Sequence, residues 1–224
     1  EYREEILAAY VNGNFTTDRF RLDLGARLDR AEFTADMAQV LGGVLQPDQV
    51  RYTGKDTHLL PYATANIFLS DAFRVKAAAS QTLGRPNPEM IATVEQTDTT
   101  ERTITRGNPF IKPRKATNLD LGLEYYFNRG AGMVTLTGFY KDISDDILTI
   151  TTTELIDGEE WEVSQPINGE STSYKGIEFG IVNNSFGNVA PLLDKVGASL
   201  NLVWVKGKSA YLYNGVRRDS DRLQ

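Results

Sequence analysis

Apolar and polar residues alternate along several stretches of the chain. Between Leu119 and Phe127 every odd-numbered residue is large and apolar, whereas Asp120 and Glu124 are among the even-numbered ones. Residues 19–32 show the same period of two. Because successive side chains of a β-strand point to opposite faces, this period predicts strands with one apolar and one polar face. Six further strands are expected, at about residues 4–14, 59–69, 73–83, 133–150, from 174 onward and 196–205.

Short and long connections alternate between these expected strands. Short turns are predicted at residues 14–18, 70–71 and 128–132, a longer turn at 183–195, and long polar loops at 33–58, 84–117 and 151–173. Repeated long loops are uncommon in compact domains, whereas outer-membrane barrels have short turns at one rim and long loops at the other. A soluble β-sandwich shows the same alternation of side chains. Strands of about ten residues favour the barrel, because soluble strands average about 5–6.

Composition narrows the class of protein further. The chain has 224 residues, a net charge of -6 and no cysteine. An acidic chain is a poor match for nucleic acid, and the lack of cysteine excludes disulfides and thiolate metal sites. No apolar run approaches the roughly 20 residues of a membrane-spanning helix. These observations leave an all-β protein, either a transmembrane barrel or a soluble domain.

One stretch carries a specific resemblance. Residues 107–127 read GNPFIKPRKATNLDLGLEYYF, a proline-punctuated loop followed directly by an alternating strand. This stretch resembles a signature of TonB-dependent outer-membrane receptors, in which a Gly-Asn-Pro-x-Leu-Lys-Pro loop enters a barrel strand. Three further segments, in the same order as in that family, resemble other elements of its barrel: residues 60–87, 139–145 and 165–178.

The resemblance implies a fold and a function. The chain is expected to be an all-β antiparallel meander of about eight strands, part of a transmembrane barrel of 22 strands with long extracellular loops, with the plug domain and the terminal strands absent. The family implies active uptake of a scarce nutrient, a carbohydrate or a ferric siderophore, across the bacterial outer membrane. Its implied partners are TonB with the inner-membrane energising complex, lipopolysaccharide and a small-molecule nutrient. No cofactor is expected.

The polar faces and the loops supply two sets of candidate residues. In a receptor, polar residues that line the lumen hold the plug, and the candidates are Arg21, Asp23, Arg27, Asp29, Glu124 and Glu178. Trp161 lies among three glutamates of a predicted loop, and such an indole is suited to stack on a sugar. The arginines suited to an anionic siderophore are Arg85, Arg106, Arg217 and Arg218. Packing within loops and contact with lipopolysaccharide are the alternative roles for each.

Catalysis finds little support in the chain. His58 is the only histidine and lies in a polar stretch. Asp142, Asp145 and Asp146 lack the spacing of a calcium loop, so no catalytic or metal-binding residue is assigned. The alternative function is a soluble or surface carbohydrate-binding β domain without transport activity.

Overall fold

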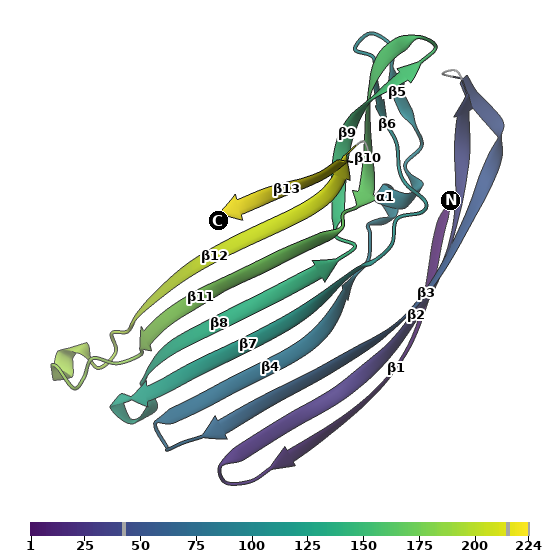
Figure 1. Cartoon of the computed structure of the whole chain (residues 1–224). Helices are drawn as coiled ribbons and strands as arrows, with labels where there is room; N and C mark the ends of the chain where they lie inside the picture. Colours follow the sequence, from purple (N-terminus) through teal and green to yellow (C-terminus); the bar gives the residue numbers. More distant parts are fainter. Residues whose placement is uncertain (42–43, 214–215, 224) are drawn as a thin grey trace.

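The chain folds into two β-sheets that meet end to end (Figure 1). The computed structural model describes residues 1–41, 44–213 and 216–223. Within these ranges, the larger sheet has nine strands in the order β1-β2-β3-β4-β7-β8-β11-β12-β13, and the smaller has four in the order β5-β6-β10-β9. All neighbours in the larger sheet are antiparallel. The predicted antiparallel meander is therefore confirmed.

The elements have the following bounds. The strands of the larger sheet are β1 (Tyr2–Thr16), β2 (Phe20–Leu41), β3 (Val44–Phe68), β4 (Phe73–Gly84), β7 (Arg114–Phe127), β8 (Gly132–Ser144), β11 (Ser171–Asn183), β12 (Ala198–Tyr213) and β13 (Val216–Leu223). Those of the smaller sheet are β5 (Gln96–Asp98), β6 (Thr103–Thr105), β9 (Ile147–Ile156) and β10 (Glu159–Asn168). The helical elements are α1 (Pro88–Ala92), η1 (Asn128–Gly130) and η2 (Pro191–Leu193).

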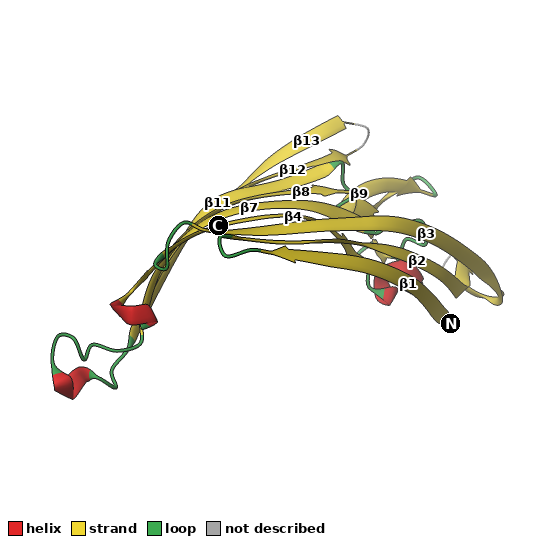
Figure 2. Ribbon diagram, turned by 90° about the horizontal axis from the view of Figure 1, so that it is seen from below, coloured by secondary structure: helices red, strands yellow, loops and turns green. Residues whose placement is uncertain are grey.

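The two ends of the larger sheet differ. The smaller sheet and α1 lie at one end, called here the long-loop end, and the turns that hold η1 and η2 lie at the other, the short-turn end (Figure 1). The larger sheet is curved, and α1 lies on its concave side (Figure 2). Among the described residues, no helix has the length and apolar composition that a membrane crossing requires.

The long loop predicted for residues 33–58 is wrong. In the described part of this region, β2 and β3 continue as paired strands, with Phe33 opposite Gly54 and Ala35 opposite Tyr52. The period of two persists here, but the apolar residues change to the other face of β2. Phe33 and Ala35 lie on the face that carries the charged Arg27 and Asp29 nearer the short-turn end. The polar composition of this stretch predicted a loop, whereas its charged residues Asp36, Arg51 and Lys55 lie on the outer face of the two paired strands.

Ion pairs cover the outer face of this hairpin. Asp36 accepts two hydrogen bonds from Arg51 on the opposite strand, with Oδ1 2.6 Å from Nε and Oδ2 3.1 Å from Nη2. The hydrogen bond from Arg51 lowers the pKa of the Asp36 carboxyl below its ordinary value. Arg30 lowers the pKa of Glu32 in the same way. Both acids are therefore ionised at neutral pH.

A small core holds α1 against the concave face. Ala35 of β2, Ile91 of α1 and Ile111 of the following loop are buried together, and Phe33 and Tyr52 pack around them. Apolar contacts of this kind are the main favourable term in packing. The core fixes the position of the loop 107–113, which joins β6 to β7.

The strand predicted over residues 133–150 is interrupted. β8 ends at Ser144, Asp145 adopts a positive φ of 53°, and β9 begins at Ile147 in the other sheet. The buried Asp146 carboxylate accepts hydrogen bonds from the Ile147 amide at 3.0 Å and from Arg114 at 3.3 Å. Asp and Asn tolerate positive φ because their short side chains bond locally to the backbone. The break therefore lies at the two aspartates.

The loops predicted for residues 84–117 and 151–173 contain structure. They supply α1, β5, β6, most of β9 and β10, and the first residues of β7 and β11. Asp157 and Gly158 join β9 to β10 with φ of 53° and 84°, the conformation of a tight hairpin turn. Since β6 pairs with β10, the two long connections are joined in one sheet. The predicted last strand, 196–205, is also longer than expected, and β13 follows it.

Candidate functional site

The convex face of the larger sheet is apolar and exposed. Strand register places Leu22, Ala65, Ala77, Leu121, Gly138 and Ile177 in one continuous row across β2, β3, β4, β7, β8 and β11. Leu121 is 59% exposed. Contiguous exposed apolar surfaces of this extent are rare on soluble monomers. The convex face is suited to contact with lipid.

The residues predicted to line the lumen share the opposite, concave face. Register connects Arg21 through Asn66, Lys76 and Thr137 to Glu178 in a single row. Lys76 forms an ion pair with Glu124 at 2.6 Å, and Arg21 with Asp23 at 3.0 Å. The concave side carries α1, whose Ile91 contacts Ala35 on this same face.

Arg85 is in a cluster of ion pairs at the long-loop end of the concave face. Its guanidinium forms an ion pair with Asp29 and another with Glu4 at 3.3 Å. Asp29 is only 3% exposed and also pairs with Arg27 at 2.9 Å. Beside this cluster, His58 Nε2 lies 3.2 Å from Asp56 Oδ1. The charge of Arg85 is thus shared between two carboxylates.

Arg106 links the strands of the smaller sheet. It donates from Nε to Gln165 Oε1 at 2.9 Å and from Nη2 to Glu154 Oε1 at 3.0 Å. Its Nη1 lies 4.0 Å from Glu95 Oε2. Arg217 repeats the pattern on β13, with Glu170 at 3.0 Å and Asp219 at 3.2 Å. Like Arg85, each of these arginines faces two carboxylates, which compensate its positive charge.

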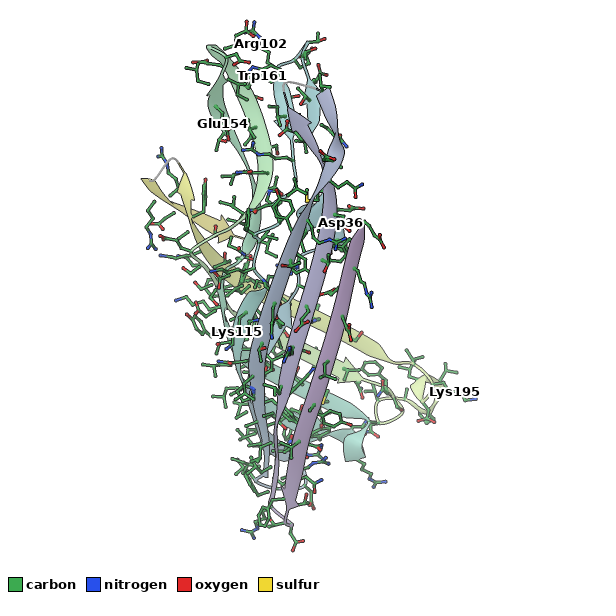
Figure 3. The ribbon with its side chains drawn as sticks, turned by 90° about the vertical axis from the view of Figure 1, so that its right-hand side faces the viewer. Asp36, Arg102, Lys115, Glu154, Trp161 and Lys195 are labelled. Atoms are coloured by element: carbon green, nitrogen blue, oxygen red, sulfur yellow. The ribbon has the colours of Figure 1, made fainter. Side chains whose placement is uncertain are left out.

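Trp161 lies near the tip of the smaller sheet. It is directly opposite Glu154 on β9 and is partly exposed. Figure 3 shows it close to Arg102, which pairs with Glu159 at 3.2 Å. Since the carboxylate of Glu154 also accepts from Arg106, Trp161 and Arg106 border one continuous polar surface. The structure does not bring Trp161 together with Arg85.

The loop of the family signature is held by side-chain amides that sequence reasoning did not single out. Asn108 donates from Nδ2 to the Pro166 carbonyl at 3.0 Å, and its backbone amide donates to the Met90 carbonyl at 2.8 Å. Asn168 binds the backbone of Lys112 from the other side. Both asparagines lie within the segments that carry the family resemblance, and these segments could have identified them from the sequence.

Arg74 was also missed. Its guanidinium lies 4.5 Å from the centroid of the Tyr126 ring and 5.2 Å from that of Phe68, at the short-turn end. Tyr126 donates to Glu124 at 2.8 Å. This cation–π arrangement fixes a cationic group on the concave face. An alternating strand pattern shows the face of Arg74 but not its partners.

An antiparallel meander with a polar concave face and an apolar convex face defines a segment of a transmembrane β-barrel. Residues 1–223 match the family model described as TonB dependent receptor-like, beta-barrel, and the chain belongs to this family of bacterial outer-membrane proteins. A comparison with curated proteins finds no match. The family match decides between the barrel and the soluble domain that the sequence left open.

Solved structures with similar folds are TonB-dependent receptors. The copper transporter OprC is 21% identical, with a TM-score of 0.62 over 94% of this chain and 33% of that chain. The hemophore receptor HasR of Serratia marcescens, in complex with its hemophore HasA and heme, is 11% identical, with a TM-score of 0.64 over 97% and 43%. The ferric-catecholate import receptor Fiu of E. coli K12 is 16% identical, with a TM-score of 0.55 over 94% and 32%. The chain therefore spans less than half of each of these relatives.

Proposed function

We propose that this chain is part of the barrel of a receptor that takes up a scarce nutrient across the outer membrane with energy supplied through TonB. The observation that carries the proposal is the family match over residues 1–223. The concave polar face is suited to hold a plug, with Arg21, Asp23, Arg27, Glu124 and Glu178 as its contacts. TonB would transmit energy from the inner membrane to the plug, which this face holds.

We further propose a neutral polyhydroxylated ligand, a saccharide, in preference to an anionic ferric siderophore. The charges on Arg85, Arg106 and Arg217 are each compensated by two carboxylates. An anionic chelate would have to compete with these carboxylates for the guanidinium groups. Trp161 beside Glu154 instead combines an aromatic face for stacking with a carboxylate acceptor for hydroxyl groups.

Uptake by whole cells tests both statements. Cells that express the receptor carrying this chain are compared with a deletion strain and with a strain lacking TonB, over a panel of labelled saccharides and ferric siderophores. Receptor- and TonB-dependent accumulation of a saccharide is expected. Accumulation of a siderophore alone would retain the transport function and overturn the ligand class. Accumulation that is unchanged without TonB would overturn the energised mechanism.

A further inference from the structure

β9 forms one edge of the smaller sheet, and its outer side is unprotected. It is the last strand in the order β5-β6-β10-β9 and pairs with β10 along its whole length of ten residues, without a shift of register. Natural sheets protect exposed edges with short strands, lysines, prolines or bulges. The opposite edge of this sheet is short, because β5 has three residues. β9 is long and contains neither lysine nor proline, so its edge is open to a further strand.

The hydrogen bonds of the neighbouring strand show which backbone groups of β9 point outward. Glu162 of β10 donates its backbone N–H to the Arg102 carbonyl at 2.9 Å, and the Ser164 carbonyl accepts from the Arg106 amide at 3.1 Å. Even-numbered residues of β10 thus direct their backbone groups toward β6, and odd-numbered residues direct theirs toward β9. Odd-numbered residues of β10 lie opposite even-numbered residues of β9. The odd-numbered residues of β9 therefore direct their N–H and C=O groups away from the sheet: Thr149, Thr151, Thr153 and Leu155.

These outward groups have no hydrogen-bond partner among residues 1–41, 44–213 and 216–223. The four residues are exposed, and Leu155 is 73% exposed. Isoleucine and threonine make up most of β9, and both favour extended strands because they are branched at Cβ. An unpaired edge of this kind binds an extended segment of another chain by continuing the ladder of backbone hydrogen bonds.

The charge of the smaller sheet indicates the charge of such a segment. Residues 95–106 and 147–168 together contain eight acidic residues and two basic ones. Glu160 and Glu162 of β10 lie directly opposite Leu155 and Thr153, and within the described part of the chain neither glutamate forms an ion pair. Since threonine is short, a lysine on an added strand reaches across β9 to these carboxylates, two strand spacings or roughly 10 Å away. A second copy of this sheet would instead bring its own acidic residues to the edge.

We propose that the edge of β9 docks an extended, lysine-rich segment of a partner protein at the long-loop end, which is the extracellular side in outer-membrane barrels. The backbone of the segment pairs with Thr149, Thr151 and Thr153, and its lysines lie on the face of Glu160 and Glu162. Its alternate residues lie on the face of Ile150, where apolar side chains are suited. Trp161 also lies on that second face, because successive residues of a strand point to opposite sides. The docking edge is therefore distinct from the proposed saccharide contact and goes beyond nutrient uptake.

Binding of a fluorescent peptide to the purified full-length receptor in detergent tests the proposal. The peptide has the length of β9, with lysine and valine in alternation. Thr151→Pro removes one outward N–H and leaves the hydrogen bonds to β10 intact, so it is expected to weaken binding roughly tenfold. Two versions of the peptide, N-methylated on alternate sets of residues, should differ: one loses binding and the other retains it, because only every second amide of an added strand faces β9.

The contribution of charge is measured separately. Glu160→Gln combined with Glu162→Gln should weaken binding of the peptide roughly fivefold and reduce its dependence on salt. Asp18→Asn combined with Asp71→Asn is the matched control. It removes the same charge from two exposed turns at the short-turn end (Figure 1) and should leave binding unchanged.

Four results would overturn the proposal. Unchanged binding to Thr151→Pro, or equal binding of the two methylated peptides, would exclude a backbone ladder at this edge. Equal binding of a peptide with glutamate in place of lysine would exclude a basic partner. A concentration-dependent dimer of the receptor that Thr151→Pro abolishes would make a second copy the occupant of the edge. Retention of the heat-sensitive gel mobility of the folded barrel shows that each variant has assembled.

Discussion

Asn168 and Lys112 are joined by a reciprocal hydrogen bond between a side-chain amide and the backbone. Asn168 Oδ1 accepts from the Lys112 amide at 2.8 Å, and Asn168 Nδ2 donates to the Lys112 carbonyl at 2.9 Å. The same Nδ2 donates to the Asp145 carbonyl at 2.9 Å. Asn168 thus connects the end of β10, the break after β8 and the loop before β7. It couples the smaller sheet to the rim of the larger one.

We expect Asn168→Ala to loosen the smaller sheet without unfolding the larger one. The substitution removes three hydrogen bonds to the backbone of Lys112 and Asp145, and a hydrogen bond of this kind contributes about 0.5–1.5 kcal/mol. Hydrogen exchange of peptides covering residues 147–168 should accelerate about tenfold or more, because about 1.4 kcal/mol is a tenfold change in an opening equilibrium. Exchange in β2 and β8 should stay the same.

Asn184→Ala, in the connection between β11 and β12, is the matched control and should leave both sheets unchanged. Asn168→Asp keeps the acceptor and loses the donor, so its effect should lie between those of the wild type and Asn168→Ala. Equal acceleration of exchange in both sheets would show that Asn168 supports the whole barrel rather than this junction.

The face assignment predicts a second outcome. Leu24, 48% exposed on the convex face, should not tolerate Lys, because a basic residue facing lipid at mid-depth costs about 2–4 kcal/mol. Asp23→Ala, one residue away on the concave face, loses an exposed ion pair with Arg21, which contributes at most about 1 kcal/mol. Urea unfolding of the receptor in lipid vesicles measures both changes.

Cysteine labelling checks the same assignment independently. In the assembled receptor, a membrane-impermeant thiol reagent should react with Asp23→Cys and not with Leu24→Cys. Equal labelling of the two positions would mean that the convex face does not meet lipid.

The strands within the apolar band were predictable because the bilayer requires apolar side chains on one face of each strand, which produces a regular alternation. Leu119, Leu121 and Leu123 face lipid, and the residues between them face the interior, so the alternation alone predicts most of β7. Beyond the band this constraint ends. At Phe33 and Ala35 the apolar residues face inward and the charged ones face water, and the stretch was therefore mistaken for a loop.

The charge compensation of the candidate arginines was not predictable from the sequence. Arg85 is 56 residues from Asp29, and Arg106 is 48 residues from Glu154. Such pairs depend on the strand register and on the paths of the long connections, neither of which a local pattern contains. The sequence predicted loops at these positions, whereas Arg217 lies on β13, and it did not show the carboxylate partners of the arginines.

The turn between β9 and β10 predicts the orientation of the barrel. Gly158 has a φ of 84° and open space around it, so an epitope inserted after it should not disturb the hairpin. We expect the tag at Gly158 to be detected by antibody on intact cells. A tag at Arg129, in the short-turn end, should be detected only after the outer membrane is permeabilised. Surface detection at Arg129 would invert the orientation of the barrel.

The ion pair between Asp36 and Arg51 predicts a dependence on pH. Because its folded pKa is lowered, Asp36 contributes stability above its ordinary unfolded pKa of roughly 4, and this contribution is lost as the pH falls through the lower folded value. Hydrogen exchange in the outer part of the β2–β3 hairpin, corrected for intrinsic rates, should be faster in Asp36→Asn than in the wild type at pH 6. The difference should disappear near pH 2. Persistence of the difference at acid pH would exclude the ion pair as its cause.

The last prediction concerns ligand contact at Trp161. Trp161 lies near the tip of the smaller sheet, partly exposed and opposite Glu154, and it is remote from the small core around Ala35. Trp161→Ala should therefore leave barrel assembly unchanged and weaken uptake of the saccharide by roughly 5- to 30-fold, since truncating an aromatic contact residue at a binding site costs about 1–2 kcal/mol. Trp161→Phe keeps an aromatic face and should retain most of the uptake. Trp204→Ala removes a tryptophan from the convex, lipid-facing side and should not change uptake of the saccharide. Wild-type uptake by Trp161→Ala across the whole panel of saccharides and siderophores would remove Trp161 from the ligand site and leave only a packing role for it.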